Sequence, residues 1–225
     1  MTPPPAPHRP VSLLGLGPMG APMAENLVRR LGALTVWNRT PGRAASVVAL
    51  GAREAASPAE AARDVVLTVL PDLAEVESLL PGPEGLLAGW HRTGTREPIL
   101  VVHGTVSPAA VRAFAEDLWV NYRVRVIDAP MSGGVPGAEE GSLSLMVGGE
   151  QHSAQSLTPV FAPIAGTVVY LGSSGSGQLA KPATRWWWRE RSRHGARLSA
   201  WQSTTACNAL TCCPPSPAAS PGPRC

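Results

Sequence analysis

Short apolar runs alternate along the chain with longer segments whose apolar residues recur at helical spacing. The first run covers residues 11–14 and ends at Gly15, a pattern typical of a buried strand. Residues 18–31 then carry apolar side chains at positions 19, 23, 27 and 31, which predicts an amphipathic helix. Pro18 suits the first turn of that helix.

Further apolar runs predict a succession of strands, separated by alanine-rich helical segments. They cover residues 33–37, 65–70, 99–102, 124–127, 143–147 and 167–171. Strands that alternate with helices form parallel βαβ units with right-handed crossovers. We therefore predict an α/β fold with a Rossmann-type, doubly wound, mostly parallel sheet. Its ligand is expected at the carboxyl ends of the strands, where the strand order reverses.

A glycine-rich turn follows the first predicted strand and opens the first predicted helix. It matches the dinucleotide-binding pattern G-x-G-x-x-G, in which the three glycines allow a tight turn, close approach of a pyrophosphate, and close packing of helix on strand. The amino terminus of the helix adds unpaired N–H groups and a positive dipole end. The diphosphate of a dinucleotide is therefore expected to rest on Gly15, Leu16, Gly17, Pro18, Met19 and Gly20.

The end of the second predicted strand favours NADP over NAD. An NAD site usually places an acid there to accept a hydrogen bond from the ribose 2′-hydroxyl. Here the residues are Asn38, Arg39 and Thr40, without a carboxylate. Arg39 can hold a 2′-phosphate through its planar fork, assisted by Asn38 and Thr40. The alternative is a solvated surface arginine, and NAD stays possible as the cofactor.

Three motifs in order resemble those of the β-hydroxyacid dehydrogenases, the family of 3-hydroxyisobutyrate dehydrogenase and tartronate semialdehyde reductase. They are the amino-terminal signature over 15–27, the segment over 128–141, and the run over 172–181. The resemblance covers about residues 11–181. It implies a Rossmann-type domain joined to an all-helical domain, and hydride transfer between nicotinamide and a small 3-hydroxy acid or its semialdehyde. Imine reductases share this framework, so a carbonyl substrate is not the only one to consider.

The resemblance also implies roles for individual residues. Leu70, Pro71 and Asp72 match the nicotinamide-side loop of the family. The next loop usually reads Asp-x-Ser-Thr, whereas this chain has His103 and Gly104 and keeps only Thr105. Side-chain contacts from the first two positions are therefore not expected here.

Two further roles concern the substrate. Ser132, Gly133 and Gly134 match residues that hold the substrate carboxylate, and a hydroxyl with exposed N–H groups can bind an anion. Lys181 is the only lysine in the chain and matches the family's general acid–base. A lysine can lose and regain a proton when its surroundings lower its pKa, which arginine cannot do.

Composition narrows the class of protein. Apolar residues make up 44% and charged residues 16% of the 225 residues, which excludes global disorder. No apolar run approaches the ~18 residues that span a bilayer, and residues 1–10 read as a disordered leader without a secretory signal. We expect a cytoplasmic protein, without membrane or nucleic-acid partners. The five histidines lack metal-ligand spacing, so no metal is expected.

The segment after Lys181 departs from the family pattern. Six arginines and one glutamate give residues 182–225 a formal charge of +5, whereas the first 181 residues carry −2. Deleting one base from a family-like coding sequence for Lys-Ala-Cys-Asn-Gln-Val-Val-Val-Ala would produce the observed Lys-Pro-Ala-Thr-Arg-Trp-Trp-Trp-Arg. We therefore predict an NAD(P)-binding domain over 11–175 and a frameshift-like, largely disordered basic tail over 176–225 in place of the helical domain. Oligomeric state stays open, since family members usually pair through that domain.

Two alternatives remain for the protein as a whole. The arginine- and tryptophan-rich tail could stack on bases and neutralise phosphates. The chain could also be a catalytically dead NADP-binding module, because the helical domain that closes the active site would be lost.

Overall fold

The computed structural model describes residues 9–182, and the predictions for residues 1–8 and 183–225 lie outside the described residues. The helices and strands, in chain order, are β1 (Val11–Leu14), α1 (Gly20–Leu31), β2 (Thr35–Trp37), α2 (Ala45–Ala49), β3 (Arg53–Glu54), β4 (Val65–Thr68), α3 (Leu73–Ser78), α4 (Leu86–Thr93), β5 (Ile99–Val102), α5 (Pro108–Tyr122), β6 (Arg125–Asp128), β7 (Met131–Ser132), α6 (Gly134–Glu140), β8 (Leu143–Gly148), α7 (Gln151–Ser156), α8 (Thr158–Phe161) and β9 (Ala165–Gly172). A further helical segment covers 176–182. In this part of the chain, no helix is long and apolar enough to cross a membrane.

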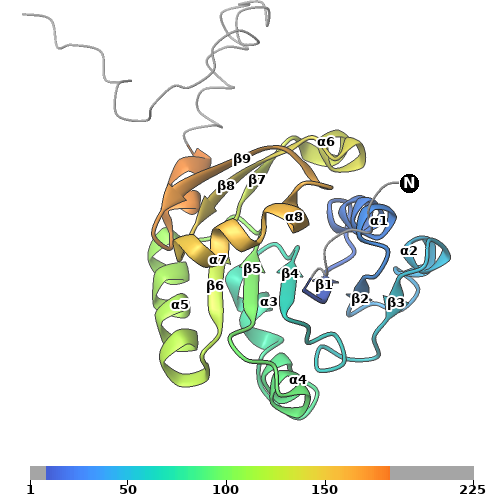
Figure 1. Ribbon diagram of the computed structural model, residues 1–225, viewed down its shortest axis with the longest axis horizontal. Coiled ribbons are helices and arrows are strands. Elements are labelled where there is room, and N and C mark those ends of the chain that lie inside the picture. Colours follow the sequence, from blue (N-terminus) through green and yellow to red (C-terminus); the bar gives the residue numbers. More distant parts are fainter. Residues whose placement is uncertain (1–8, 183–225) are drawn as a thin grey trace, which may run out of the picture. The chain divides into compact units, whose positions relative to one another are not determined.

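The strands form one mostly parallel sheet with the order β3-β2-β1-β4-β5-β6-β8-β7, and β9 pairs with β8 (Figure 1). The six strands from β3 to β6 are parallel, β8 is antiparallel to β6 and β7, and β9 is parallel to β8. The predicted doubly wound fold is therefore confirmed. Only β3 and β7 were not predicted, because two residues are too few to show a period.

The order of the strands reverses between β1 and β4, since β2 lies on one side of β1 and β4 on the other. This is the switch point at which a ligand binds beyond the carboxyl ends of the strands. The motifs of the sequence follow those ends: the glycine turn comes after β1, Leu70 after β4 and Thr105 after β5.

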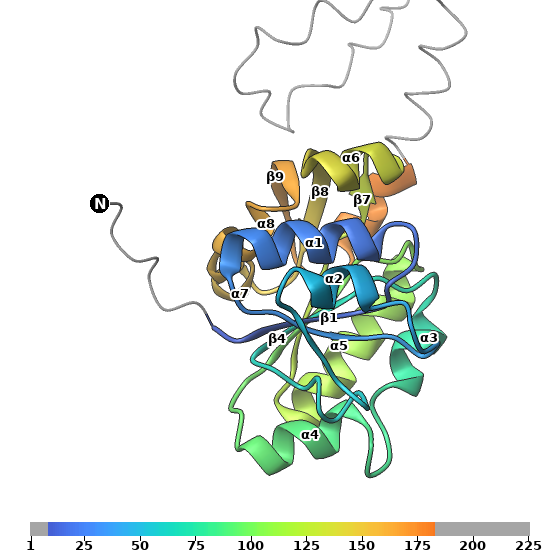
Figure 2. The same ribbon diagram turned by 90° about the vertical axis from the view of Figure 1, so that its right-hand side faces the viewer.

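The sheet has a hydrophobic core on each face. Side chains alternate across a strand, so Leu13 and Leu67 pack with α1 on one face, whereas Leu14 and Val66 pack on the other. The first core also includes residues from α2, α6, α7 and α8, and the second includes residues from α3, α4 and α5. Figure 2 shows α1 and α2 on the side of the sheet away from α4.

Helix α1 begins two residues later than the pattern predicted. Pro18 and Met19 belong to the turn, and the helix begins at Gly20 with no side chain capping its amino terminus. It ends at Leu31, and the following Gly32 has a left-handed φ of 73°. In the first turn of α1, Pro22 has no N–H, and the N–H groups of Ala21 and Met23 donate to the carbonyl oxygens of Gly17 and Met19.

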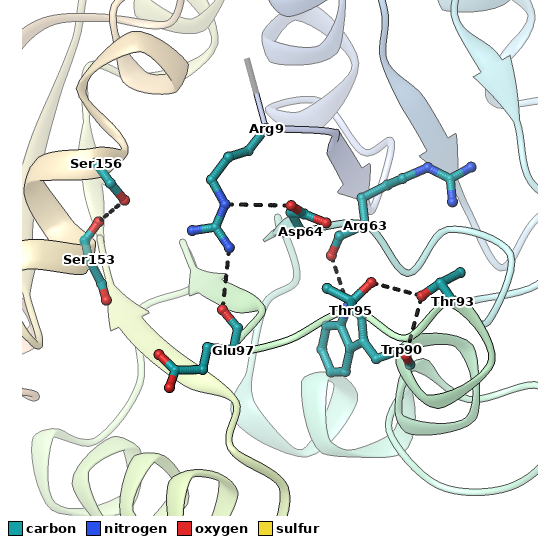
Figure 3. Close-up of polar contacts among 9 residues, drawn as sticks. All are labelled: Arg9, Arg63, Asp64, Trp90, Thr93, Thr95, Glu97, Ser153 and Ser156. Atoms are coloured by element: carbon teal, nitrogen blue, oxygen red, sulfur yellow. Dashed lines mark hydrogen bonds and ion pairs between the residues drawn. The ribbon is translucent and has the colours of Figure 1, made fainter. Parts of the chain in front are cut away.

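Polar contacts tie the loops together at the amino-terminal ends of the strands (Figure 3). Arg9 lies 3.7 Å from the Asp64 carboxylate and donates to the Glu97 carbonyl oxygen at 3.3 Å. The Trp90 indole N–H donates to the Arg63 carbonyl oxygen at 2.8 Å. Arg9 thus makes specific contacts although it falls within the predicted disordered leader.

Candidate functional site

The glycine turn combines two tightly packed positions with one open position. Gly15 has a φ of +101°, and a Cβ atom there would lie 2.5 Å from the Val69 carbonyl oxygen. A Cβ atom at position 20 would overlap the Gly15 carbonyl oxygen, whereas one at Gly17 would meet nothing within 4 Å. Open space at Gly17 beside the start of α1 fits a diphosphate, because the amino terminus of a helix is the positive end of its dipole and attracts anions.

The loop after β2 is held directly to the glycine turn. The Leu16 N–H donates to Asn38 Oδ1 at 2.9 Å, and Asn38 Nδ2 donates to the Thr40 carbonyl oxygen at 2.9 Å. The Asn38 amide therefore organises the turn, which differs from its expected contact with a 2′-phosphate. Arg39 has a side chain that is 78% exposed and lies 3.6 Å from the Glu75 carboxylate on α3.

The loops after β4 and β5 touch each other beyond the ends of their strands. A Cβ atom at Gly104 would overlap the Leu70 carbonyl oxygen, so the two main chains are in close contact. Pro71 and Thr105 are exposed at this edge. Asp72 instead caps α3, where its Oδ1 accepts from the Glu75 N–H at 2.8 Å. Its carboxylate thus stabilises a helix in addition to any role toward a ligand.

His103 points into the core at the end of β5. It is 2% exposed, its Nδ1 lies 2.8 Å from the Ala129 carbonyl oxygen, and its ring packs edge-on against Phe161. Nε2 has no hydrogen-bond partner, so the neutral ring donates through Nδ1. Burial lowers the pKa of His103 to about 4, and the side chain is neutral at pH 7.

Lys181 and Ser132 come together although 49 residues separate them. Lys181 Nζ donates to Ser132 Oγ at 2.9 Å and to the Met131 carbonyl oxygen. The adjacent Gly133 and Gly134 are exposed and have φ values of 134° and 63°, a backbone that favours glycine. A lysine amine, a hydroxyl and exposed main chain therefore meet at one place.

Asp128 and Gln178 are buried polar residues that hold the segment carrying Lys181. Neither was predicted as a site residue from the sequence. Asp128, at the end of β6, is fully buried and accepts from the N–H groups of Gly175 at 2.7 Å and Gln178 at 3.0 Å. Burial raises the pKa of the Asp128 carboxyl, and these N–H donors act in the opposite direction. A carboxylate directly after a buried strand is the signal that could have identified it.

The boundary predicted between residues 175 and 176 therefore moves. Residues 176–182 form a helix whose first N–H groups bind the Asp128 carboxylate, so this segment belongs to the folded domain. The remainder of the predicted tail, residues 183–225, lies outside the described residues.

Two cavities lie at the opposite end of the sheet from these motifs. One, of about 390 Å³, is lined by Trp90, Pro98 and Tyr122 among others, and one of about 330 Å³ by Arg9, Arg125 and His152 among others. They border residues that precede β5 and β6, whereas the glycine turn and Ser132 follow strand ends. Neither cavity belongs to the candidate site.

The fold and the glycine turn define a dinucleotide-binding domain, and comparison with known proteins agrees. Residues 10–172 match the family model of the NAD binding domain of 6-phosphogluconate dehydrogenase. The chain is 35% identical over 173 residues to 3-hydroxyisobutyrate dehydrogenase of Pseudomonas aeruginosa, covering 76% of this chain and 56% of that protein. It is 33% identical over 180 residues to 2-hydroxy-3-oxopropionate reductase of Escherichia coli, covering 78% of this chain and 59% of that protein.

A solved structure gives the same result. The chain superimposes on 3-hydroxyisobutyrate dehydrogenase of Mycobacterium tuberculosis, a structure described with L-serine, with a TM-score of 0.66 and 28% identity. The match covers 85% of this chain and 68% of that one. The chain therefore belongs to the β-hydroxyacid dehydrogenase family and carries its NAD-binding domain. It spans a little over half the length of the curated relatives that it matches.

Proposed function

We propose that the chain binds NADP at the glycine turn and serves hydride transfer between nicotinamide and a small 3-hydroxy acid or its semialdehyde. The observation that carries this proposal is the contact between Lys181 Nζ and Ser132 Oγ at 2.9 Å. A second support is the close contact among the loops that follow β1, β4 and β5: Gly15 packs on Val69, and Gly104 packs on Leu70.

In this proposal each group of the chain has a defined task. Bound nicotinamide would supply or accept the hydride. Lys181 Nζ, as the neutral amine, would take the proton of the substrate hydroxyl during oxidation, and as the ammonium it would return that proton during reduction. Ser132, Gly133 and Gly134 would hold the substrate carboxylate through the hydroxyl and main-chain N–H groups. Leu70, Pro71 and Thr105 would border the nicotinamide.

The proposed preference for NADP rests on Arg39. Its side chain is exposed and its partner Glu75 lies 3.6 Å away, so a 2′-phosphate could replace a weak surface ion pair. Replacing Arg39 by Gln should weaken NADPH binding by about ten- to 150-fold, because a charge-assisted hydrogen bond contributes about 1.5–3 kcal/mol. NADH binding should change less than about twofold. Arg30→Gln, at the exposed end of α1, is the control.

Fluorescence titration with NADPH and NADH measures both affinities. Equal affinities of the unaltered chain for the two dinucleotides would contradict the preference for NADP. No binding of either one would overturn the proposed function as a whole.

A second candidate is a dinucleotide-binding module without turnover. It is favoured by the extent of the match. The alignment covers 56–59% of the two relatives, and the remaining 41–44% of their length lies outside it. Mispositioned reactants can cost orders of magnitude in rate even when the cofactor is bound. We expect NADPH binding with little or no oxidation in the presence of tartronate semialdehyde. Steady oxidation that Lys181→Met abolishes would favour the enzyme over the module.

A further inference from the structure

Gln178 joins the helical segment of Lys181 to the loop after β5. The side chain is 1% exposed. Its Nε2 donates to the Gly104 carbonyl oxygen at 2.8 Å, and its Oε1 accepts from the Val106 N–H at 3.0 Å. The amide thus binds the main chain on both sides of Thr105, using its donor and its acceptor together.

The same residue is fixed to the sheet through its main chain. The Gln178 N–H donates to Asp128 Oδ2, and the Gly175 N–H donates to Asp128 Oδ1. The start of the 176–182 helix is therefore attached to β6 by a buried carboxylate and to the β5 loop by a buried amide. Buried polar groups that are fully paired specify one arrangement, because any other leaves them unsatisfied.

Lys181 follows Gln178 by three residues, which places the two side chains about one helical turn apart on neighbouring positions of the helix surface. At the far end of this short helix, Lys181 Nζ reaches Ser132 Oγ. The short helical segment over 176–182 therefore connects the Gln178 contacts around Thr105 with the Lys181 contact at Ser132.

We propose that Gln178 is a positioning residue that couples the loop at Thr105 to Lys181. This inference rests on the proposed function, in which nicotinamide lies against Thr105 and Lys181 handles the substrate proton. A dinucleotide bound against this loop thereby affects the surroundings of Lys181 Nζ through Gln178. Gln178 itself touches no reacting atom.

The experiment uses Lys181 as its own reporter, because it is the only lysine in the chain. Expression with [¹³Cε]lysine gives a single Hε–Cε resonance from the full chain. Its chemical shift and its pH titration are measured with and without NADPH, in the unaltered protein and in Gln178→Met. Methionine has a similar volume to glutamine but cannot bond to Gly104 or Val106.

Two control variants separate positioning from general effects. Gln155→Met makes the same chemical change at an exposed position of α7. Trp90→Phe removes a partly buried hydrogen bond at the opposite end of the sheet, to the Arg63 carbonyl oxygen (Figure 3), and so lowers stability without touching the site. Both should keep the resonance and the pKa of Lys181 as they are in the unaltered chain.

In Gln178→Met without NADPH, the resonance should move at least halfway toward its position in the urea-unfolded chain. NADPH should still bind, and the change that it causes in the resonance should fall at least threefold. If Gln178→Met does not fold, Gln178→Glu, which keeps an acceptor for Val106, is held to the same criteria.

An unchanged Lys181 resonance and an unchanged NADPH response in the Gln178 variant would overturn the inference. Equal changes in Trp90→Phe would also overturn it, because they would reflect lost stability alone. Failure of NADPH to bind the unaltered chain would contradict the proposed function, whereas the ligand-free resonance would still decide whether Gln178 positions Lys181.

Discussion

The buried ring of His103 makes the stability of this domain sensitive to mild acid. Burial lowers its pKa from 6.5 to about 4 in the folded chain. Between these pH values the unfolded chain binds more protons than the folded one, so acid favours unfolding. The contribution is fully present above about pH 6.5 and is lost as the pH falls toward 4. With these two pKa values, the free energy of unfolding drops by about 2 kcal/mol between pH 7 and pH 5.

Replacing His103 by Asn tests this reasoning. The Asn amide can donate to the Ala129 carbonyl oxygen as Nδ1 does, but it does not titrate. The variant will be less stable at pH 7 because a smaller side chain leaves space beside Phe161. Its free energy of unfolding should nevertheless fall about 2 kcal/mol less than that of the unaltered chain between pH 7 and pH 5.

Urea unfolding at several pH values, followed by circular dichroism, gives these free energies. The comparison between the two proteins cancels other titrating groups, among them Asp128, whose raised pKa acts in the opposite direction. Parallel pH profiles for the two proteins would refute the assignment of acid sensitivity to His103.

Two further predictions concern the glycine turn. Gly20→Ala should lower the free energy of unfolding by about 2 kcal/mol or more, since its Cβ would overlap the Gly15 carbonyl oxygen. Gly17→Ala, at the open position, should change the melting temperature by less than about 2 °C but weaken NADPH binding. Similar melting temperatures for both variants would contradict this packing. Asn38→Ala should leave the Leu16 N–H without its partner, which lowers the free energy of unfolding by about 1–3 kcal/mol. It should weaken the binding of NADPH and NADH equally. A loss confined to NADPH would indicate that Asn38 contacts the 2′-phosphate instead.

The elements that the sequence alone determined are those whose signal is local. A strand buried on both faces needs a mostly apolar run, and residues 11–14, 65–68 and 99–102 have one, interrupted only by Ser12 and Thr68. The glycine turn could be recognised because tight turning and close packing of main chain admit almost no other residue. The family motifs likewise located Lys181 and Ser132 as separate residues.

Only the tertiary structure decided how those residues are connected. Gln178 reaches Gly104 across 74 residues, and Asp128 reaches Gly175 across 47, so no window of sequence contains both partners. Asn38 could serve a phosphate or the turn, and only the position of Leu16 beside it shows that it binds the turn. The physical reason is that a polar side chain has several possible partners, and the order of strands in the sheet determines which of them lies within hydrogen-bond reach.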